Sequence, residues 1–235
     1  MPISDLSDST QNYLKMIWGI KEHSSGPVTA SALVARSGLR KSSVSDALKR
    51  LAAAGLVEHQ PYGAIELTEL GRGYALEVIR RHRLIETFLV ETLGYRWDQV
   101  HDEAEVLEHA VSDFLVERLD AFLAYPRRDP HGDPIPSAQG EIEELLPLTL
   151  ADLPADQGKL ELLVERISDA DPDLLRRLAA LGVGPGSRLR LSGQQEGQVL
   201  LSLLPSQGRE PDQGREEAFS LSLHEARALT VSYLP

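Results

Sequence analysis

Cysteine is absent from this 235-residue sequence. Its absence excludes disulfide bonds, thiolate catalysis, and zinc or iron–sulfur sites built on cysteine. A bound metal would need histidine, carboxylate, amide or backbone-oxygen ligands. Such ligands favour harder or borderline ions such as Mn(II), Fe(II), Co(II) and Zn(II) over Cu(I).

Long apolar runs are missing too, and no stretch of about 18 apolar residues could span a bilayer. The N-terminal segment MPISDLSDSTQNYLK lacks the basic, apolar and small-residue order of a secretory signal. We therefore expect a cytoplasmic protein with no membrane partner. With 42% hydrophobic and 26% charged residues, the chain reads as globular and long enough for one large domain or two to three small ones.

The net charge of −12 is spread unevenly along the chain. Residues 1–76 carry eight Lys/Arg and seven Asp/Glu, a net +1, whereas residues 77–145 carry seven and sixteen, a net −9. Residues 146–235 carry nine and thirteen, a net −4. Because acidic surfaces repel phosphate, the first third is the part of the chain compatible with nucleic acid.

The first third also has the order helix, helix, helix, hairpin. Helical periods are predicted for SDSTQNYLKMIWGIKEH, TASALVARSG and KSSVSDALKRLAAAG, the last with Gly55 as its stop. Two short β segments, LVEHQ and AIELT, flank a turn at Pro61-Tyr62-Gly63. This order is typical of a winged helix-turn-helix.

The third of these helices would enter the DNA major groove, with Val44, Leu48 and Leu51 turned inward. Lysine and arginine suit phosphates, whereas serine and aspartate suit base edges, and Asp46 could accept from cytosine N4. A purely structural or protein-binding winged helix is the alternative. Since the local charge of +1 is small, we expect a homodimer that uses two copies on double-stranded DNA. The predicted DNA-binding residues are Lys41, Ser42, Ser43, Ser45, Asp46, Lys49 and Arg50.

Two long helices are predicted for the middle third, from near Thr68 to Gly94 and from about Trp97 to Pro126. A Pro-rich loop, PRRDPHGDPIP, follows. From about Lys159 the chain becomes β-prone, with one helix at PDLLRRLAALG, and a small β-barrel is the preferred interpretation. The expected strand segments are LELLVERI, SRLRLSG, QVLLSLLP, AFSLSL and LTVSYLP.

The segment HDEAEVLEHAVSD, residues 101–113, concentrates acidic and histidine side chains in the second long helix. On a continuous helix His101, Glu105, Glu108 and His109 fall within an arc of roughly 100°. The same face continues to the apolar residues Leu115, Val116 and Leu119, so these four would begin a stripe expected to be buried. From this spacing alone, a charged helix face and a ligand set both remain open.

The preceding helix carries His82 and Glu86 at i, i+4. Two neighbouring helices that each present histidine and glutamate favour a shared metal site. A metal-dependent hydrolase could use the same groups. However, the sequence lacks an HExxH motif, a serine-nucleophile elbow, a P-loop and GxGxxG. The cluster also follows a predicted winged helix-turn-helix in the same chain. We therefore expect no enzyme and no catalytic residue.

Together these segments resemble the diphtheria-toxin-repressor family of metal-dependent transcriptional repressors, which includes iron-dependent and manganese-transport regulators. The resemblance covers nearly the whole chain, and its motifs follow the family's order: YLKMIW, SSVSDALKRLAAAGLV, LTELGRGYA, RRHRLIETFL, VHDEAEVLEHAVSD and PHGDPIP.

The fold implied by the resemblance is multidomain and mainly α with small β. A winged helix-turn-helix DNA-binding domain would span 1–76, and a helical metal-binding and dimerisation domain 77–145. A linker would span 146–158, and an SH3-like (FeoA-like) β-barrel 159–235.

The resemblance also implies a ligand set. Primary ligands would be Glu105, Glu108 and His109, and ancillary ligands His82, Glu86 and His101. The third domain donates ligands in longer members, which makes Asp169, Asp171 and Asp173 candidates.

Position 105 is cysteine in the family's iron branch and glutamate in its manganese branch. Glu105 therefore favours Mn(II), with Fe(II) as the alternative. The resemblance implies a Mn(II)-activated repressor of metal-uptake genes that binds operator DNA as a homodimer, with no organic cofactor. An Fe(II)-responsive repressor of the same family is the alternative.

The first helix departs from the family pattern at two positions. Asn12 stands where relatives have a Met or Asp ligand, and its amide oxygen could still ligate. Lys15 stands where the short manganese regulators have a further Glu, and a charged lysine cannot ligate. A two-metal site copied from those regulators is therefore in doubt.

Overall fold

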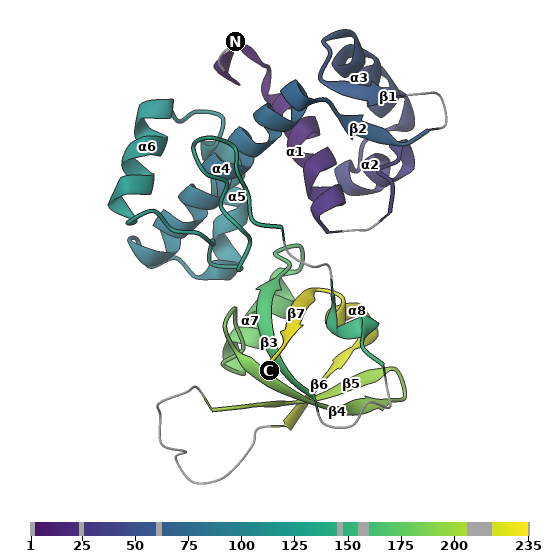
Figure 1. The fold of residues 1–235 in the computed structure, drawn as a ribbon, viewed down its shortest axis with the longest axis vertical. Coiled ribbons are helices and arrows are strands. Elements are labelled where there is room, and N and C mark those ends of the chain that lie inside the picture. The colour runs from purple at the N-terminus through teal and green to yellow at the C-terminus, as the bar shows by residue number, and fades with distance from the viewer. Residues whose placement is uncertain are drawn as a thin grey trace. The chain divides into compact units, whose positions relative to one another are not determined.

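The computed structural model describes residues 3–23, 26–59, 63–144, 148–154, 160–205 and 218–234. The chain, drawn as a ribbon in Figure 1, divides into two compact units, and one boundary between them falls between Ile85 and Glu86, within a long helix. The first unit comprises Met1–Ile85, Glu103–Arg127 and Ile135–Pro147, and the second comprises Glu86–Asp102, Arg128–Pro134 and Leu148–Pro235. Among the described residues, no helix is long and apolar enough to cross a membrane.

The first unit begins with the predicted helix, helix, helix, hairpin order. The Ser7 side chain caps the first helix and the Thr29 side chain the second, each by accepting a backbone N–H, and Gly38 ends the second helix in the left-handed conformation. The two strands pair antiparallel with Val57 opposite Leu67. The predicted turn residues Pro61 and Tyr62 lie outside the described residues. The elements are α1 (Asp8–Glu22), α2 (Ala30–Ser37), α3 (Lys41–Ala53), β1 (Val57–His59) and β2 (Ile65–Leu67).

One apolar core holds these elements together. Leu14 and Ile17 of α1 and Val44 and Leu48 of α3 are at most 1% exposed and belong to the same cluster. The predicted inward face of α3 is thereby confirmed. Each fully buried leucine or isoleucine adds about 1.5–3 kcal/mol to folding, so α1 and α3 are held together firmly.

The long helix α4 (Glu69–Glu91) follows the hairpin, as predicted from the stretch between Thr68 and Gly94. Gly71 lies in its first turn, where a Cβ would come within 1.9 Å of the Leu56 backbone oxygen. Glycine is therefore required for the start of α4 to pack this closely on the segment before β1.

The predicted second long helix, from Trp97 to Pro126, is wrong. The chain instead forms η2 (Trp97–Gln99), α5 (Val100–Leu107) and α6 (Asp113–Phe122), with a turn between the two α-helices. Ser112 caps α6 by accepting from the Leu115 backbone N–H, a strong signal for a new helix start. The predicted apolar stripe is accordingly interrupted: Val116 is buried, but Leu115 is 43% exposed.

The second unit contains, among its described residues, a five-stranded antiparallel sheet in the order β6-β5-β4-β3-β7. Its core includes Leu162 and Val164 of β3 and Leu175 and Leu178 of a helix that follows β3. The predicted β-rich C-terminal part and its helix at PDLLRRLAALG are confirmed, but a second, short helix follows β6 and was not predicted. The elements are η3 (Leu150–Asp152), β3 (Leu160–Ile167), α7 (Pro172–Ala180), β4 (Arg188–Gln195), β5 (Gln198–Leu203), β6 (Ala218–Ser222), α8 (Leu223–Ala226) and β7 (Leu229–Tyr233).

Part of the segment expected to be a linker packs into this core. Leu150 and Leu153 are buried among the sheet's apolar residues, and the Val231 N–H donates to the Leu148 carbonyl. The remaining residues of that expected linker, 146–147 and 155–158, lie outside the described part of the chain.

Candidate metal centre and DNA interface

Glutamate and histidine side chains from α4, α5 and the turn after α5 meet in the first unit. Ligand atoms of His82, Glu105 and Glu108 all lie within 4.8 Å of one another. Glu108 is 0% exposed and His82 is 6% exposed. A fully buried carboxylate requires positive charge or hydrogen-bond donors nearby.

In the described structure that positive charge comes from Lys15 of α1. Its Nζ donates to Glu105 Oε1 at 2.5 Å and to Glu108 Oε2 at 2.7 Å, and it lies 3.0 Å from His82 Nδ1. Sequence reasoning excluded Lys15 as a ligand but did not foresee it inside the cluster. The available signal was its position one helical turn after Asn12.

His109 is held by a residue that the sequence analysis missed. The Gln11 side-chain amide donates to the Ile3 and Leu6 carbonyls at 3.2 and 2.9 Å, which fixes Gln11 Oε1 as an acceptor. His109 Nδ1 lies 2.9 Å from this oxygen and must therefore carry the ring proton. In the neutral imidazole, the lone pair is then on Nε2, which is the form that binds a metal ion.

Two of the buried side-chain atoms that lack a hydrogen-bond partner among the described residues belong to His109 and Asn12. His109 Nε2 lies 3.5 Å from Glu108 Oε1 but makes no hydrogen bond, and Asn12 Oδ1 has no hydrogen-bond partner. Unsatisfied buried acceptors are costly unless a ligand satisfies them. Neutral nitrogen, amide oxygen and carboxylate oxygen together fit a borderline divalent ion such as Mn(II) or Fe(II).

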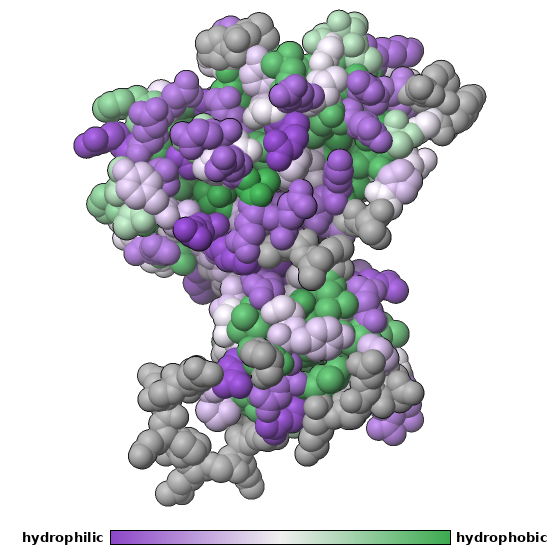
Figure 2. Space-filling view, viewed as in Figure 1, coloured by the Kyte–Doolittle hydropathy of each residue, from purple (hydrophilic) through white to green (hydrophobic). Residues whose placement is uncertain are grey.

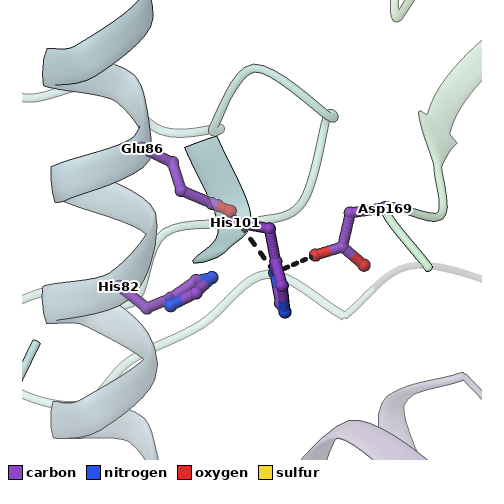
Figure 3. A group of neighbouring side chains, drawn as sticks. All are labelled: His82, Glu86, His101 and Asp169. Atoms are coloured by element: carbon purple, nitrogen blue, oxygen red, sulfur yellow. Dashed lines mark ion pairs between the residues drawn. The ribbon is translucent and has the colours of Figure 1, made fainter. Parts of the chain in front are cut away.

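A second group of charged side chains, Glu86, His101 and Asp169, lies in the second unit. Figure 3 draws these residues, and it also draws His82, which lies one turn before Glu86 on α4. His101 Nδ1 lies 2.7 Å from Asp169 Oδ2 and 3.7 Å from Glu86 Oε1. Glu86 is 1% exposed. Hydrogen bonding to Asp169, followed by that to Glu86, raises the pKa of His101 to about 10. This histidine is protonated without metal and must lose its proton to ligate one.

The three aspartates of ISDADPD have different environments. Asp169 approaches His101, whereas Asp171 caps α7 by accepting from the Asp173 and Leu174 backbone N–H groups. The Asp173 side chain is 89% exposed and pairs with Arg176. Of the three, the structure therefore brings Asp169 to the second group and engages the other two elsewhere.

The loop after α6 adds two residues that were not among the predicted ligands. Ligand atoms of Glu86, Asp129 and His131 lie within 4.8 Å of one another, and all three residues are buried. His131 Nε2 lies 2.8 Å from the Trp97 carbonyl and donates to it, and Nδ1 lies 3.8 Å from Glu86 Oε2. Both residues lie in the quoted loop PRRDPHGDPIP.

The predicted reader residues form one exposed face of α3, since Lys41, Ser42, Ser43, Ser45, Asp46, Lys49 and Arg50 are all exposed. Lys49 Nζ contacts Asp46 Oδ1 at 3.2 Å. Both side chains are more than half exposed, so this pair can open at little cost when DNA approaches.

Exposed apolar side chains lie on α6. Phe114, Leu115 and Phe122 are 71%, 43% and 66% exposed. Figure 2 shows pale green, apolar surface over this helix at the left edge of the view. Exposed aromatic side chains on one short helix are typical of a surface that binds protein.

Three family models match the chain in succession. The iron dependent repressor N-terminal DNA binding domain matches residues 5–65, and the iron dependent repressor metal binding and dimerisation domain matches residues 68–137. The FeoA domain matches residues 148–232. The predicted fold class is confirmed: a winged helix-turn-helix, a helical dimerisation domain and a C-terminal SH3-like domain.

Curated relatives and solved structures agree with these matches. The iron-dependent repressor IdeR of Mycobacterium leprae (strain TN) is 32% identical over 211 residues, which cover 85% of this chain and 90% of the relative. A manganese-dependent transcriptional repressor in complex with manganese is 45% identical with a TM-score of 0.84, covering 96% of this chain and all of the other. ScaR with bound Zn2+ is 30% identical with a TM-score of 0.78, covering 96% and 99%.

Proposed function

The chain belongs to the diphtheria-toxin-repressor family of iron-dependent repressors and is a metal-dependent transcriptional repressor, and from this premise we propose Mn(II) as its corepressor, with Fe(II) as the alternative. The single observation that carries the proposal is Glu105, whose carboxylate lies in the cluster with Glu108. A carboxylate in place of a sulfur ligand favours Mn(II). The relatives are repressors, so nothing among them supports the hydrolase alternative.

For the primary site, we assign Glu105, Glu108 and His109 Nε2 as ligands, with Asn12 Oδ1 as a neutral donor. The buried, unsatisfied Nε2 and Oδ1 atoms support this assignment. For the ancillary site, we assign Glu86, His101 and Asp169 of the second unit, and His82 stays an ancillary ligand only as the sequence analysis predicts it. The 2.7 Å approach of Asp169 to His101 supports Asp169 over Asp171 and Asp173.

Helix α1 is the element that links the metal site to the reader. One face brings Gln11 and Lys15 into contact with the cluster, while Leu14 and Ile17 lie in the core shared with α3. When bound, a divalent ion supplies positive charge that holds the carboxylates and α1 donors together. The position of α1, and with it the orientation of α3, thus depends on how the cluster's charge is satisfied.

The coupling is thermodynamic. The arrangement that fits DNA must bind metal more tightly than the alternative arrangement does. By linkage, operator DNA must raise the affinity for metal by the same factor. We further propose that the operators control metal-uptake genes.

The protein acts on DNA as a dimer, because a helix-turn-helix dimer reads two half-sites in successive major grooves. The match to a dimerisation domain over residues 68–137 supports a homodimer. We assign the exposed apolar face of α6 to the dimer contact, since its Phe114 and Phe122 would be buried by a second copy.

The proposal is tested by operator binding in a gel shift at controlled free Mn(II) and Fe(II) without oxygen. We expect Mn(II) to support binding at the lower free concentration, and Glu108→Gln to abolish the metal response. Glu103→Gln is the matched control, because Glu103 lies on α5 but is exposed. Operator binding by Glu108→Gln that keeps its full metal dependence would overturn the site assignment, and stronger activation by Fe(II) would favour the alternative.

A further inference from the structure

The Lys15 ammonium lies at the point where the ligand atoms of the primary cluster converge. Its Nζ is 2.5 Å from Glu105 Oε1, 2.7 and 3.0 Å from the two Glu108 oxygens, and 3.0 Å from His82 Nδ1. The same three residues form the group whose ligand atoms lie within 4.8 Å of one another. A lysine is therefore located where these donors would otherwise surround a metal ion.

Charge explains why the cluster holds this lysine. Glu108 is 0% exposed, and the Lys15 side chain is only 17% exposed. Two carboxylates this close to each other would repel without a cation between them, and the ammonium supplies one positive charge and three donors. The lysine thus performs, through its covalent tether on α1, the neutralisation that a divalent ion would perform.

The geometry around His82 supports this interpretation. Its Nδ1 is 2.5 Å from Glu108 Oε2 and 3.0 Å from Lys15 Nζ. An uncharged imidazole nitrogen either donates or accepts, so one of these two contacts is not a hydrogen bond. His82 Nδ1 therefore lies, with the two carboxylates, among the atoms that surround the Lys15 ammonium.

We propose that Lys15 sets the metal stoichiometry of this repressor. Its ammonium fills one cation position among His82, Glu105 and Glu108, so the chain binds one divalent ion fewer than this cluster would otherwise hold. The buried His109 Nε2, which lies 3.5 Å from Glu108 Oε1 and makes no hydrogen bond, stays available to a metal ion at the other position. This inference rests on the proposed metal-binding role of the cluster.

The test counts metal ions on the full-length protein. Wild type, Lys15→Glu and Lys15→Met are purified with Mn(II) present, so that a variant unstable without metal still reaches the measurement. Bound Mn(II) is then measured by equilibrium dialysis and elemental analysis. We expect Lys15→Glu to bind one more Mn(II) per chain than wild type, and Lys15→Met to do so with lower affinity because it adds no ligand.

Two further variants test whether the metal count depends on a positive charge at residue 15 in particular. Lys15→Arg retains the positive charge and should keep the wild-type stoichiometry. Lys21→Met removes an exposed lysine from the same helix and should change nothing. An unchanged Mn(II) count in both Lys15→Glu and Lys15→Met would overturn the proposal and make Lys15 a structural ion pair only.

Thermal unfolding provides an independent readout. With chelator present, Lys15→Met should unfold at a lower temperature than wild type because Glu108 loses its counter-charge, and Mn(II) should raise its unfolding temperature more than it raises that of wild type. Equal Mn(II) shifts in the two proteins would contradict the proposal. Failure of the proposed function is a different result: Glu108→Gln in the wild-type background would then leave the Mn(II) count unchanged.

Discussion

The imidazole of His101 on α5 contacts the carboxylate of Asp169, which follows strand β3, with Nδ1 2.7 Å from Oδ2. A residue distant in the sequence thus supplies the anion that faces this histidine. Within the second unit, the segment after β3 therefore takes part in the candidate ancillary site as well as in the sheet's fold.

Asp169→Asn should weaken metal binding at the ancillary group. The amide keeps the shape of the side chain but removes its charge, and the loss of such a partner at a metal site typically costs about 10-fold to 100-fold in affinity. Mn(II) titration by calorimetry measures the effect. Asp173→Asn is the control because the Asp173 side chain is 89% exposed, and an equal loss in both variants would argue against a specific role for Asp169.

The stability of the metal-free protein should depend on the charge of His101. Its pKa is raised to about 10 by Asp169 and Glu86, above the value of about 6.5 expected in the unfolded chain. The stabilising contribution is therefore fully present below about pH 6.5 and is lost as the pH rises toward about 10.

This pH dependence can be measured by urea unfolding with chelator at a series of pH values. The free energy of unfolding should fall between about pH 7 and pH 10, and it should fall less steeply in His101→Gln. Parallel curves for the two proteins would show that His101 does not contribute.

Gln11→Met should weaken metal binding although residue 11 is not itself an assigned ligand. The variant removes the oxygen that holds His109 Nδ1 at 2.9 Å and so releases the ring orientation. We expect a loss of roughly 10-fold in Mn(II) affinity. The circular dichroism spectrum of the metal-loaded variant tests whether the helices remain, and unchanged affinity would exclude this positioning role.

Asp46→Ala should reduce sequence discrimination more than overall DNA affinity. A carboxylate that accepts from cytosine N4 contributes about 1–3 kcal/mol of discrimination against the wrong base. Lys49→Ala is the comparison, because the loss of a phosphate contact should weaken binding to all sequences and reduce the salt slope by about 1. Equal losses on operator and random DNA for Asp46→Ala would mean that Asp46 reads no base.

Phe122→Glu should dissociate the dimer. A buried aromatic residue at an interface commonly contributes about 2 kcal/mol or more, which corresponds to roughly a 30-fold weaker dimer. Sedimentation velocity across a concentration series measures the dissociation constant. Tyr233→Glu, at an exposed aromatic position of β7, should leave it unchanged, and a dimer that tolerates Phe122→Glu would place the interface elsewhere.

Local patterns in the sequence predicted most of the helices and strands. Caps, glycine stops and apolar periods are properties of neighbouring residues, and they identified α1 to α4, the reader face and the strands of the C-terminal sheet. One continuous helix was wrongly predicted between Leu107 and Asp113 because charged residues continue the helical period through the turn. The cap at Ser112 was in the sequence, but its signal was outweighed by that period.

The site could be predicted only in part. Acidic and histidine residues at helical spacing on two helices favoured a shared site, but the sequence analysis placed His82 in the ancillary set and not beside Glu105 and Glu108, where the structure has it. The contacts of Lys15 and Gln11 with residues about 90 positions away depend on tertiary packing, which no local pattern encodes. The ligand assignments therefore remain predictions for the experiments above.

The chemical type of the ligand atoms in the cluster around Glu108 affects how the site responds to oxidants. Peroxide converts an exposed thiolate ligand first to a sulfenic acid and then to irreversible products. In this chain, which has no cysteine, position 105 presents a carboxylate, and carboxylates do not undergo this chemistry. A repressor whose cluster is built from oxygen and imidazole nitrogen should therefore keep its ligands through an oxidant exposure that would destroy a thiolate-based site.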